Sequence, residues 1–378
     1  MMLSRLVSRA TALTTASNSC FFHSTIHFYI KAAASSTTSS TTSSTTMDRE
    51  FSTLTKKPLT MPDQEQEMKL SELQHAVRTH HSHGNYPEAL SSAKTVLAVS
   101  MEHFGRNHPS TASAFNNLGL MHKLQGDYVN AREMYHEALQ VYGDMLGKDH
   151  ASYAAALHNI AVLNTSQCHL DESLKQMERL SLNEQALEYS EEAWRIRTLE
   201  LGKTHPFTLA SQSHMGSTLA DMVMQQASTT DGKIKLTKLT QQRWQQAEEH
   251  LRKAMNAAIQ TPRGEVMKDT KQRIITLYSA ACAQSLAVFL KTKATLDEVY
   301  NDEESLAEAK GLYEEVLIVR SHLLDPLHPD TVATKFSLAE LLQVLGQDEE
   351  ANKIRADLVE DFGVQELDET NVEGDNQK

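Results

Sequence analysis

Four histidines crowd the segment HAVRTHHSHG, and imidazole nitrogens are common ligands of zinc in proteins. They are His75, His80, His81 and His83. No cysteine or paired carboxylate stands beside them to complete a zinc site. We therefore interpret the cluster as the solvated end of a helix, and we expect the protein to hold no metal and no other cofactor.

The tripeptide GKT at residues 202–204 is typical of a loop that cradles the phosphates of a nucleotide. The complete motif has another glycine five residues before Gly202, and this chain has Arg197 there. Gly202 is better interpreted as the residue that ends a helix. The chain also lacks GxSxG, HExxH and a strand-borne GxGxxG, so we expect no enzymatic activity.

A hydrophobic pattern recurs along the chain. GNYPEALSSAKTVL begins at Gly84 and GDYVNAREMYHEAL at Gly126, 42 residues later, with Gly, Tyr and Ala in matching places. A short connection recurs as well: His108-Pro109, Asp149-His150, His205-Pro206 and His328-Pro329. Eleven residues after each histidine stands a small residue: Gly119, Ala161, Gly216 and Ala339. This spacing predicts pairs of helices that touch closely at the small residue, with a glycine such as Gly126 turning the chain between them.

The pattern resembles the tetratricopeptide repeat, a helix–turn–helix unit. The resemblance rests on Phe115, Leu118 and Gly119 followed by Ala131, Tyr135 and Ala138. A 42-residue unit with an "LG..HP" connection is similar to the kinesin-light-chain subtype. The resemblance implies an all-α fold, a tetratricopeptide-repeat α-solenoid in which stacked pairs form a right-handed superhelix and the first helices line a concave surface.

The resemblance covers residues 68–363 and predicts five to six repeats. The units are 68–107, 108–149, 150–204, 205–262, 263–327 and 328–363. Insertions interrupt three of them, around residues 174–185, at residues 227–240, and at the acidic TLDEVYNDEES. We expect a linker at residues 48–67 and an acidic disordered tail at residues 364–378.

Residues 1–47 differ from the rest of the chain. They contain Arg5, Arg9 and Lys31 but no acidic residue, and the two arginines lie opposite an apolar stripe of a potential helix. Such a start resembles a mitochondrial transit peptide, followed here by a Ser/Thr-rich disordered linker. We therefore expect a mitochondrial location. Plastid import and a cytoplasmic protein begun at Met47 stay as alternatives.

The charge balance bears on the partners. The chain has 36 basic and 49 acidic residues, a net charge of −13, which argues against nucleic acid and anionic lipid as main partners. No apolar run is long enough for a membrane span, so we expect no stable membrane insertion. A protein or peptide partner remains, and the oligomeric state is left open.

The side chains just before each small residue should face the concave surface. They are Asn116, Asn117, Lys123, His158, Asn159, Ser213 and His214. The resemblance implies that groove asparagines hold the backbone of an extended peptide. The alternative is that asparagine simply tolerates a partly exposed helix position. A carboxylate clamp would add a cation from the first helix of the third unit, and none occurs in residues 151–166.

We therefore predict a non-enzymatic scaffold for protein–protein interaction. Its plan is similar to that of mitochondrial tetratricopeptide proteins that support respiratory-complex assembly, which favours an assembly or adaptor factor. The alternative is a cytosolic cargo adaptor of the kinesin-light-chain type. That adaptor would need a heptad coiled coil ahead of the repeats, and residues 48–67 contain two prolines and no heptads.

The targeting prediction can be tested with a reporter. Residues 1–47 fused to a fluorescent protein should enter mitochondria, because Arg5 and Arg9 form the basic face of an amphipathic segment. Replacing both arginines with glutamate should leave the reporter in the cytosol. A wild-type fusion that stays cytosolic under the microscope would remove the import hypothesis and favour the adaptor.

Overall fold

The computed structural model describes residues 61–171, 174–230, 233–235, 237–260, 276–296, 302–324 and 326–361. The predicted transit segment and Ser/Thr-rich linker at residues 1–47 and the predicted tail at residues 364–378 lie outside these residues. Twelve helices are described: α3 (Met61–Ser82), α4 (Tyr86–Phe104), α5 (Pro109–Leu124), α6 (Tyr128–Leu146), α7 (Ala151–Leu170), α8 (Gln176–Glu200), α9 (Pro206–Gln226), α10 (Lys238–Gln260), α11 (Leu277–Leu296), α12 (Glu303–Leu323), α13 (Pro329–Val344) and α14 (Asp348–Asp361).

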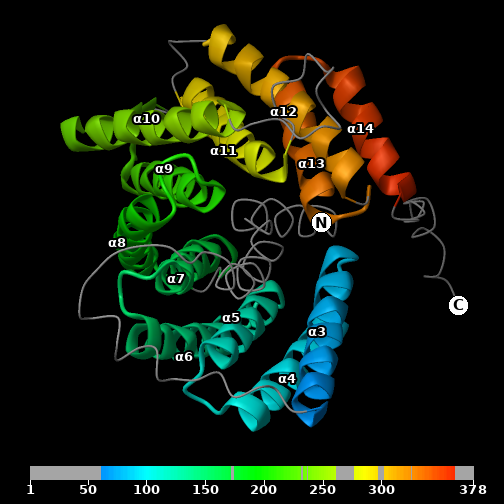
Figure 1. Cartoon of the computed structure of the whole chain (residues 1–378). Coiled ribbons are helices and arrows are strands. Elements are labelled where there is room, and N and C mark those ends of the chain that lie inside the picture. The colour runs from blue at the N-terminus through cyan, green and yellow to red at the C-terminus, as the bar shows by residue number, and fades with distance from the viewer. Residues whose placement is uncertain are drawn as a thin grey trace, which may run out of the picture.

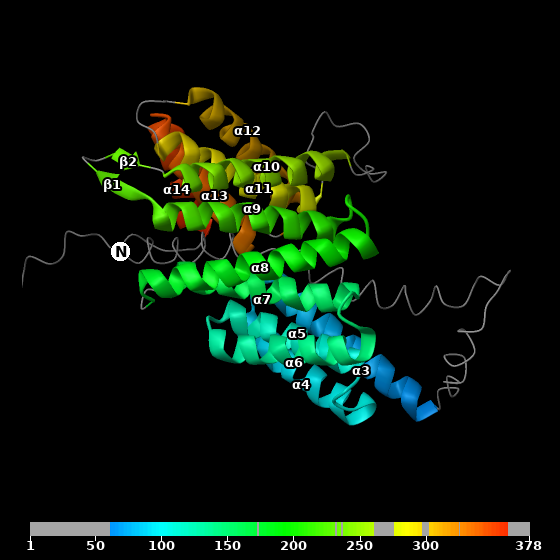
Figure 2. The ribbon, with the colours of Figure 1, turned by 90° about the vertical axis from the view of Figure 1, so that its left-hand side faces the viewer.

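The helices form six successive pairs that stack along a curved array (Figures 1 and 2). The odd-numbered first helices lie on the inside of the curve and the even-numbered second helices on the outside (Figure 1). This is a tetratricopeptide-type α-solenoid, as predicted. One small hairpin departs from the all-α plan: β1 (Ser228–Thr230) pairs antiparallel with β2 (Lys233–Lys235) in the insertion predicted at residues 227–240.

Each predicted small residue lies where the two helices of a pair touch. A Cβ atom at Gly119 would lie 2.8 Å from a ring carbon of Tyr135 and 3.2 Å from the carbonyl oxygen of Ala131. At Gly216, a Cβ atom would lie 2.7 Å from Leu251 Cγ. The corresponding alanines, Ala161 and Ala339, are fully buried. The close-contact prediction is therefore confirmed at the two glycines, and Gly126 turns the chain between α5 and α6 with φ of +78°.

Histidine begins four of the first helices. The Nδ1 atoms of His108, His150, His205 and His328 each accept a hydrogen bond from the backbone N–H two residues later, at 3.1 to 3.2 Å. Each bond satisfies a backbone donor that the helix leaves open at its N-terminus. The acceptor role requires an unprotonated Nδ1, and burial lowers the pKa of His108, His150 and His205 in agreement with it.

Threonine hydroxyls tie two of the units to the ones before them. Thr111 Oγ1 donates to the carbonyl oxygen of Gly105 at 2.7 Å, and Thr208 Oγ1 donates to that of Gly202 at 2.8 Å. Both acceptors lie in the connection that leaves a second helix. Gly202 thus belongs to an inter-unit turn, as its interpretation as a helix-ending residue requires.

Two buried arginines repeat this tie. Arg197, near the end of α8, donates from Nη1 to the carbonyl oxygen of Phe207 at 3.0 Å and to Ser211 Oγ at 2.7 Å. Arg320, near the end of α12, makes the same two bonds to residues ten and fourteen positions further on. Burial lowers the pKa of Arg197 to about 9. These side chains fix how one pair sits against the next.

One segment differs from the sequence prediction, and one predicted insertion proves to be helical. The helix α3 begins at Met61, so residues 61–67 are helical, whereas the sequence predicts a linker over residues 48–67. Pro62 is the second residue of α3, where proline's missing N–H costs nothing. The insertion around residues 174–185 lengthens α8 to 25 residues, against 19 for α6, because it is rich in helix-forming residues.

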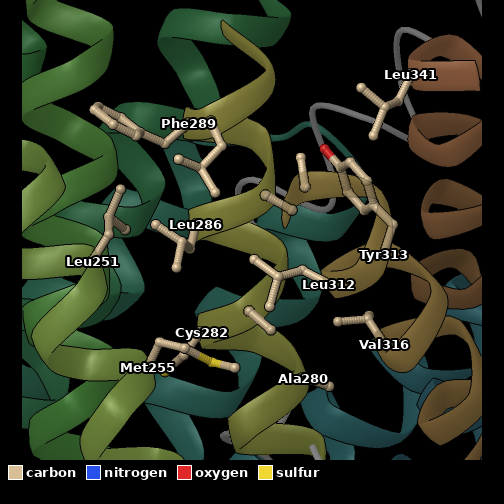
Figure 3. Packing of buried hydrophobic residues seen from close by; sticks show 14 of the residues in the cluster. Leu251, Met255, Ala280, Cys282, Leu286, Phe289, Leu312, Tyr313, Val316 and Leu341 are labelled. Carbon is tan, nitrogen blue, oxygen red and sulfur yellow. The ribbon is translucent and has the colours of Figure 1, made fainter. Parts of the chain in front are cut away.

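The largest hydrophobic core joins the C-terminal pairs. Leu251 and Met255 of α10, Leu286 and Phe289 of α11, and Leu312 of α12 point toward one another (Figure 3). Smaller clusters fill the N-terminal pairs. The helices bury their apolar stripes against the next pair as well as within their own, which is what a stacked array requires.

Two connections far apart in sequence come close in space. The end of α3 faces the start of α13 across the inside of the curve (Figure 1). Burial raises the pKa of Tyr86, at the start of α4, and the nearby Asp330 carboxylate of α13 raises it further. Burial and then His328 lower the pKa of His81 to about 4, and Asp330 opposes this. The array therefore bends until its last pair reaches its first.

The substitutions Gly119→Ala and Gly311→Ala, compared with each other, test the close contact between α5 and α6. Each substitution gains roughly 1 kcal/mol of helix stability by removing a helical glycine. The added Cβ would strike the Tyr135 ring at position 119, whereas no atom lies within 4 Å of it at position 311 in α12. Overpacking should therefore make Gly119→Ala less stable than Gly311→Ala by about 1–3 kcal/mol in urea denaturation. Equal stabilities would show that the contact at Gly119 is not tight.

Candidate functional site

The candidate site is the inner face of the curve, where the first helices lie. Residues Asn116 and Asn159, both predicted to face the groove, are brought together: Asn159 Nδ2 on α7 donates to Asn116 Oδ1 on α5 at 2.9 Å. The bond links one amide to the next across neighbouring units. Asn117 lies beside Asn116 on α5 and is almost buried. Contact of these amides with a peptide stays a prediction.

The predicted histidines lie deeper than expected. His158 of α7 and His214 of α9 are buried, and their rings pack edge to face with centroids 5.5 Å apart. His158 Nδ1 lies 3.4 Å from Ser211 Oγ, the same hydroxyl that Arg197 contacts. These contacts show that the two rings pack between α7 and α9 and help to hold these helices together.

Hydrogen bonds hold both nitrogens of the His214 ring. Nδ1 lies 2.8 Å from Ser190 Oγ on α8, and Nε2 lies 3.1 Å from Thr165 Oγ1 on α7. Burial lowers the pKa of His214 to about 4, so the ring is neutral at physiological pH. Burial also lowers the pKa of His158, to which Arg197 adds. Both rings are thus neutral members of a polar network inside the solenoid.

The remaining predicted residues, Ser213 and Lys123, are also buried. Ser213 is hydrogen-bonded to the thiol of Cys282 on α11. Burial lowers the pKa of Lys123 to about 8, although the Asp330 carboxylate opposes that shift. The charge of Lys123 also lowers the pKa of His158 and His214, so this cation belongs to the centre of the inner face.

Sequence reasoning missed several residues of this face. His169 Nε2 on α7 lies 3.0 Å from Asp221 Oδ2 on α9, and that carboxylate raises the pKa of His169. Fifty-two positions separate the two residues, and no local pattern joins them. A signal did exist for Arg197 and Arg320, because each stands eight residues before the histidine of the next connection.

The clustered histidines near the end of α3 make separate contacts within the protein. His83 Nδ1 bonds the carbonyl oxygen of Thr79 at 2.7 Å, and His75 Nδ1 lies 3.3 Å from Thr79 Oγ1. His81 is buried against Tyr86. No group of three or more His, Cys, Asp or Glu side chains suited to a metal occurs among the residues that the structure describes.

The sequence model of the tetratricopeptide repeat matches residues 75–142 and 110–181. Residues 75–181 are tetratricopeptide repeats. The pairs from α9 to α14 continue the same helix order, with Gly216 in the same close contact as Gly119 and Ala339 fully buried. Tetratricopeptide repeats form concave surfaces that bind proteins. Within the described part of the chain, no helix combines the length and apolarity needed to cross a membrane.

Several solved structures match this chain over more than nine-tenths of their own length. The kinesin-light-chain-type TPR-like repeats from Podosopora anserina, which are nearly identical to one another, share 20% sequence identity with this chain. Their TM-score is 0.40, over 67% of this chain and 98% of that one. BtubC (BKLC) from P. vanneervenii is 14% identical, with a TM-score of 0.43 over 81% and 95%. The assembly chaperone of RpL4 (Acl4) is 19% identical, with a TM-score of 0.40 over 78% and 91%. No curated protein sequence matches the chain.

The neutral state of His214 predicts a loss of stability in acid. Its pKa is about 4 when folded and 6.5 when unfolded, so between these values only the unfolded chain binds the proton. The contribution is complete above about pH 6.5 and declines as the pH falls toward 4, by roughly 3 kcal/mol in all. The free energy of unfolding, measured by urea denaturation between about pH 7 and pH 4.5, should fall with decreasing pH in the wild type. It should fall less steeply in His214→Gln. The same slope in both proteins would contradict the neutral ring.

Proposed function

We propose that this protein is a non-enzymatic scaffold that holds a peptide segment of a partner protein on its concave face. The observation that carries the proposal is the amide pair Asn116–Asn159, which links the first helices of two adjacent units at 2.9 Å. Side-chain amides offer both donors and acceptors, so a row of them can match the backbone of an extended chain without reading its sequence.

The distribution of charge supports a groove of this kind. The inner helix α7 has no Asp, Glu, Lys or Arg, and the inner helix α9 has Asp221 alone. The outer helix α8 has six acidic and three basic residues. With so few charges, α7 and α9 favour hydrogen bonding to a neutral peptide backbone, while the charged α8 is suited to contact with water.

We propose further that the scaffold acts in mitochondria, as an assembly or adaptor factor, with respiratory complexes as the first candidates. The acid-free start with Arg5 and Arg9 supports import. The cytosolic cargo adaptor remains the alternative, and the reporter fusion described above separates the two locations.

The groove can be tested by affinity capture with the tagged full chain from purified mitochondria. Asn117→Ala combined with Asn159→Ala should lose the proteins that the wild type retains, because the amides that hold the peptide backbone are gone. The double variant should stay folded, since losing one hydrogen bond to Asn116 costs about 1 kcal/mol. Thermal melting checks this.

Gln140→Ala is the matched control for the double variant. Gln140 is an exposed amide on the outer helix α6, so its removal should change neither melting nor capture. If the folded double variant retains the same proteins as the wild type, the partner docks elsewhere and the groove assignment is wrong.

A further inference from the structure

A second groove opens on the outer side of the array, between the starts of α6 and α8. Its volume is about 560 Å³, which lies within the range of pockets that bind ligands in proteins. The insertion around residues 174–185 builds one wall of it, because the first turns of the lengthened α8 extend past the start of α6 (Figure 2). We call this surface the outer groove, and its apolar side chains include Val129, Leu174, Met177 and Leu182.

Hydrogen bonds hold the inserted segment in place. Arg179 of α8 donates to the carbonyl oxygens of Asp171 at 2.7 Å and of Leu174 at 3.2 Å. Gln176 Nε2, in the first turn of α8, donates to the carbonyl oxygen of Gln225 near the end of α9 at 2.7 Å. The outer groove is therefore preformed, and a ligand loses little free energy in ordering its walls.

Two apolar side chains of the outer groove stand in water. Val129 is 80% exposed and Met177 is 76% exposed, the highest values for large hydrophobic side chains among the described residues. Covering them would remove apolar surface from water, which favours binding. Sites for small molecules enclose most of their ligand, whereas these side chains have to be covered from outside, as the surface of another protein would do.

A cation without a counter-ion lies in the same groove. Arg132 of α6 is partly buried, and its Nη1 and Nη2 atoms donate to Asn164 Oδ1 at 2.7 Å and to Gln167 Oε1 at 2.9 Å. Both acceptors are neutral amides, and no carboxylate of the described residues forms an ion pair with this guanidinium. Burial lowers the pKa of Arg132, because the charged form loses hydration there. The guanidinium has further N–H donors for a ligand.

These charges favour a carboxylate as the polar group of the ligand. A carboxylate would form charge-assisted hydrogen bonds with Arg132 and supply the missing counter-ion, whereas an ammonium group would be repelled. The other charged residue of the groove, Glu178, is already used at the start of α8, where its Oε2 accepts from the backbone N–H of Lys175 at 2.8 Å. The net charge of −13 repels acidic ligands at long range, so a preference for them must come from the local contact.

We propose that the outer groove binds an acidic amphipathic segment of a partner protein. An apolar side chain of that segment lies between Val129 and Met177, and a neighbouring Asp or Glu pairs with Arg132. The outer groove is separate from the concave face, so this inference does not rest on the peptide groove. With both surfaces occupied, the scaffold holds two partners at once.

Four pools of capped peptides of about twelve residues provide the test. Each peptide of the first three pools has one leucine and one test residue, Glu, Gln or Lys, at spacings of one to four positions in a background of Ala, Ser, Gly and Gln. In the fourth pool, alanine replaces the leucine beside Glu. Retention of the purified full chain is measured on each pool. We expect the Leu/Glu pool to retain about tenfold more protein than the other three, the effect of one charge-assisted hydrogen bond or one buried leucine.

Two variants locate the contact. Arg132→Met keeps the aliphatic part of the side chain and removes its charge, so retention on the Leu/Glu pool should fall to that on the Leu/Gln pool. If this variant fails to fold, Met177→Glu decides, because an exposed side chain tolerates the change and the new charge should repel the acidic pool. Met145→Glu is the control. Met145 is 52% exposed in the last turn of α6, at the other end of that helix from the groove, and its substitution should keep the wild-type preference.

The remaining outcomes separate the outer groove from other surfaces. Asn117→Ala combined with Asn159→Ala should retain the Leu/Glu pool as the wild type does. Loss of retention in that double variant would place the peptide on the concave face and overturn the proposal. Equal retention of the wild type on all four pools, retention on none, or a preference for the Leu/Lys pool would overturn it as well.

Discussion

Two helices of this array can approach closely only where one of them has almost no side chain. At Gly119 the ring of Tyr135 fills the place that a Cβ would take, and at Gly216 the Leu251 side chain does the same. Because each helix presents only one apolar stripe, this contact decides which face turns outward toward the second helix. The opposite face of the first helix is then left for the interior of the curve, so the groove is a consequence of the glycine contact.

The contacts between units include directional polar bonds. Arginine bonds such as those of Arg197, and threonine bonds such as that of Thr208, fasten the end of one pair to the start of the next. Directional bonds of this kind set an angle, whereas apolar packing tolerates sliding. The neutral network around His158 and His214 continues this function on the inner side. The groove therefore has a defined curvature, and a bound peptide would meet amides at fixed intervals.

The features that depend on near neighbours could be predicted from the sequence. The helix pairs, the small residues such as Gly119 and the turn at Gly126 follow from spacings within one unit. Residues that act across units could not be predicted, because His169 meets Asp221 only after α7 and α9 have packed. The burial of His214 has the same cause, since its two partners come from α7 and α8. The predicted linker was wrong at residues 61–67 for another reason: Pro62 fits the first turn of a helix, so a proline there does not exclude one.

The closeness of the first and last pairs changes the mechanics of the array. An open solenoid is flexible along its length. A ligand can widen it at little cost in free energy through a small rotation between each pair of neighbouring units. Here the turn with His81 and Tyr86 lies near Asp330 at the start of α13, so the solenoid is almost closed into a ring. In a closed ring the joints between units cannot all open together, so widening the ring at one joint narrows it at another. A partner that widens the inner face must therefore first separate these two ends.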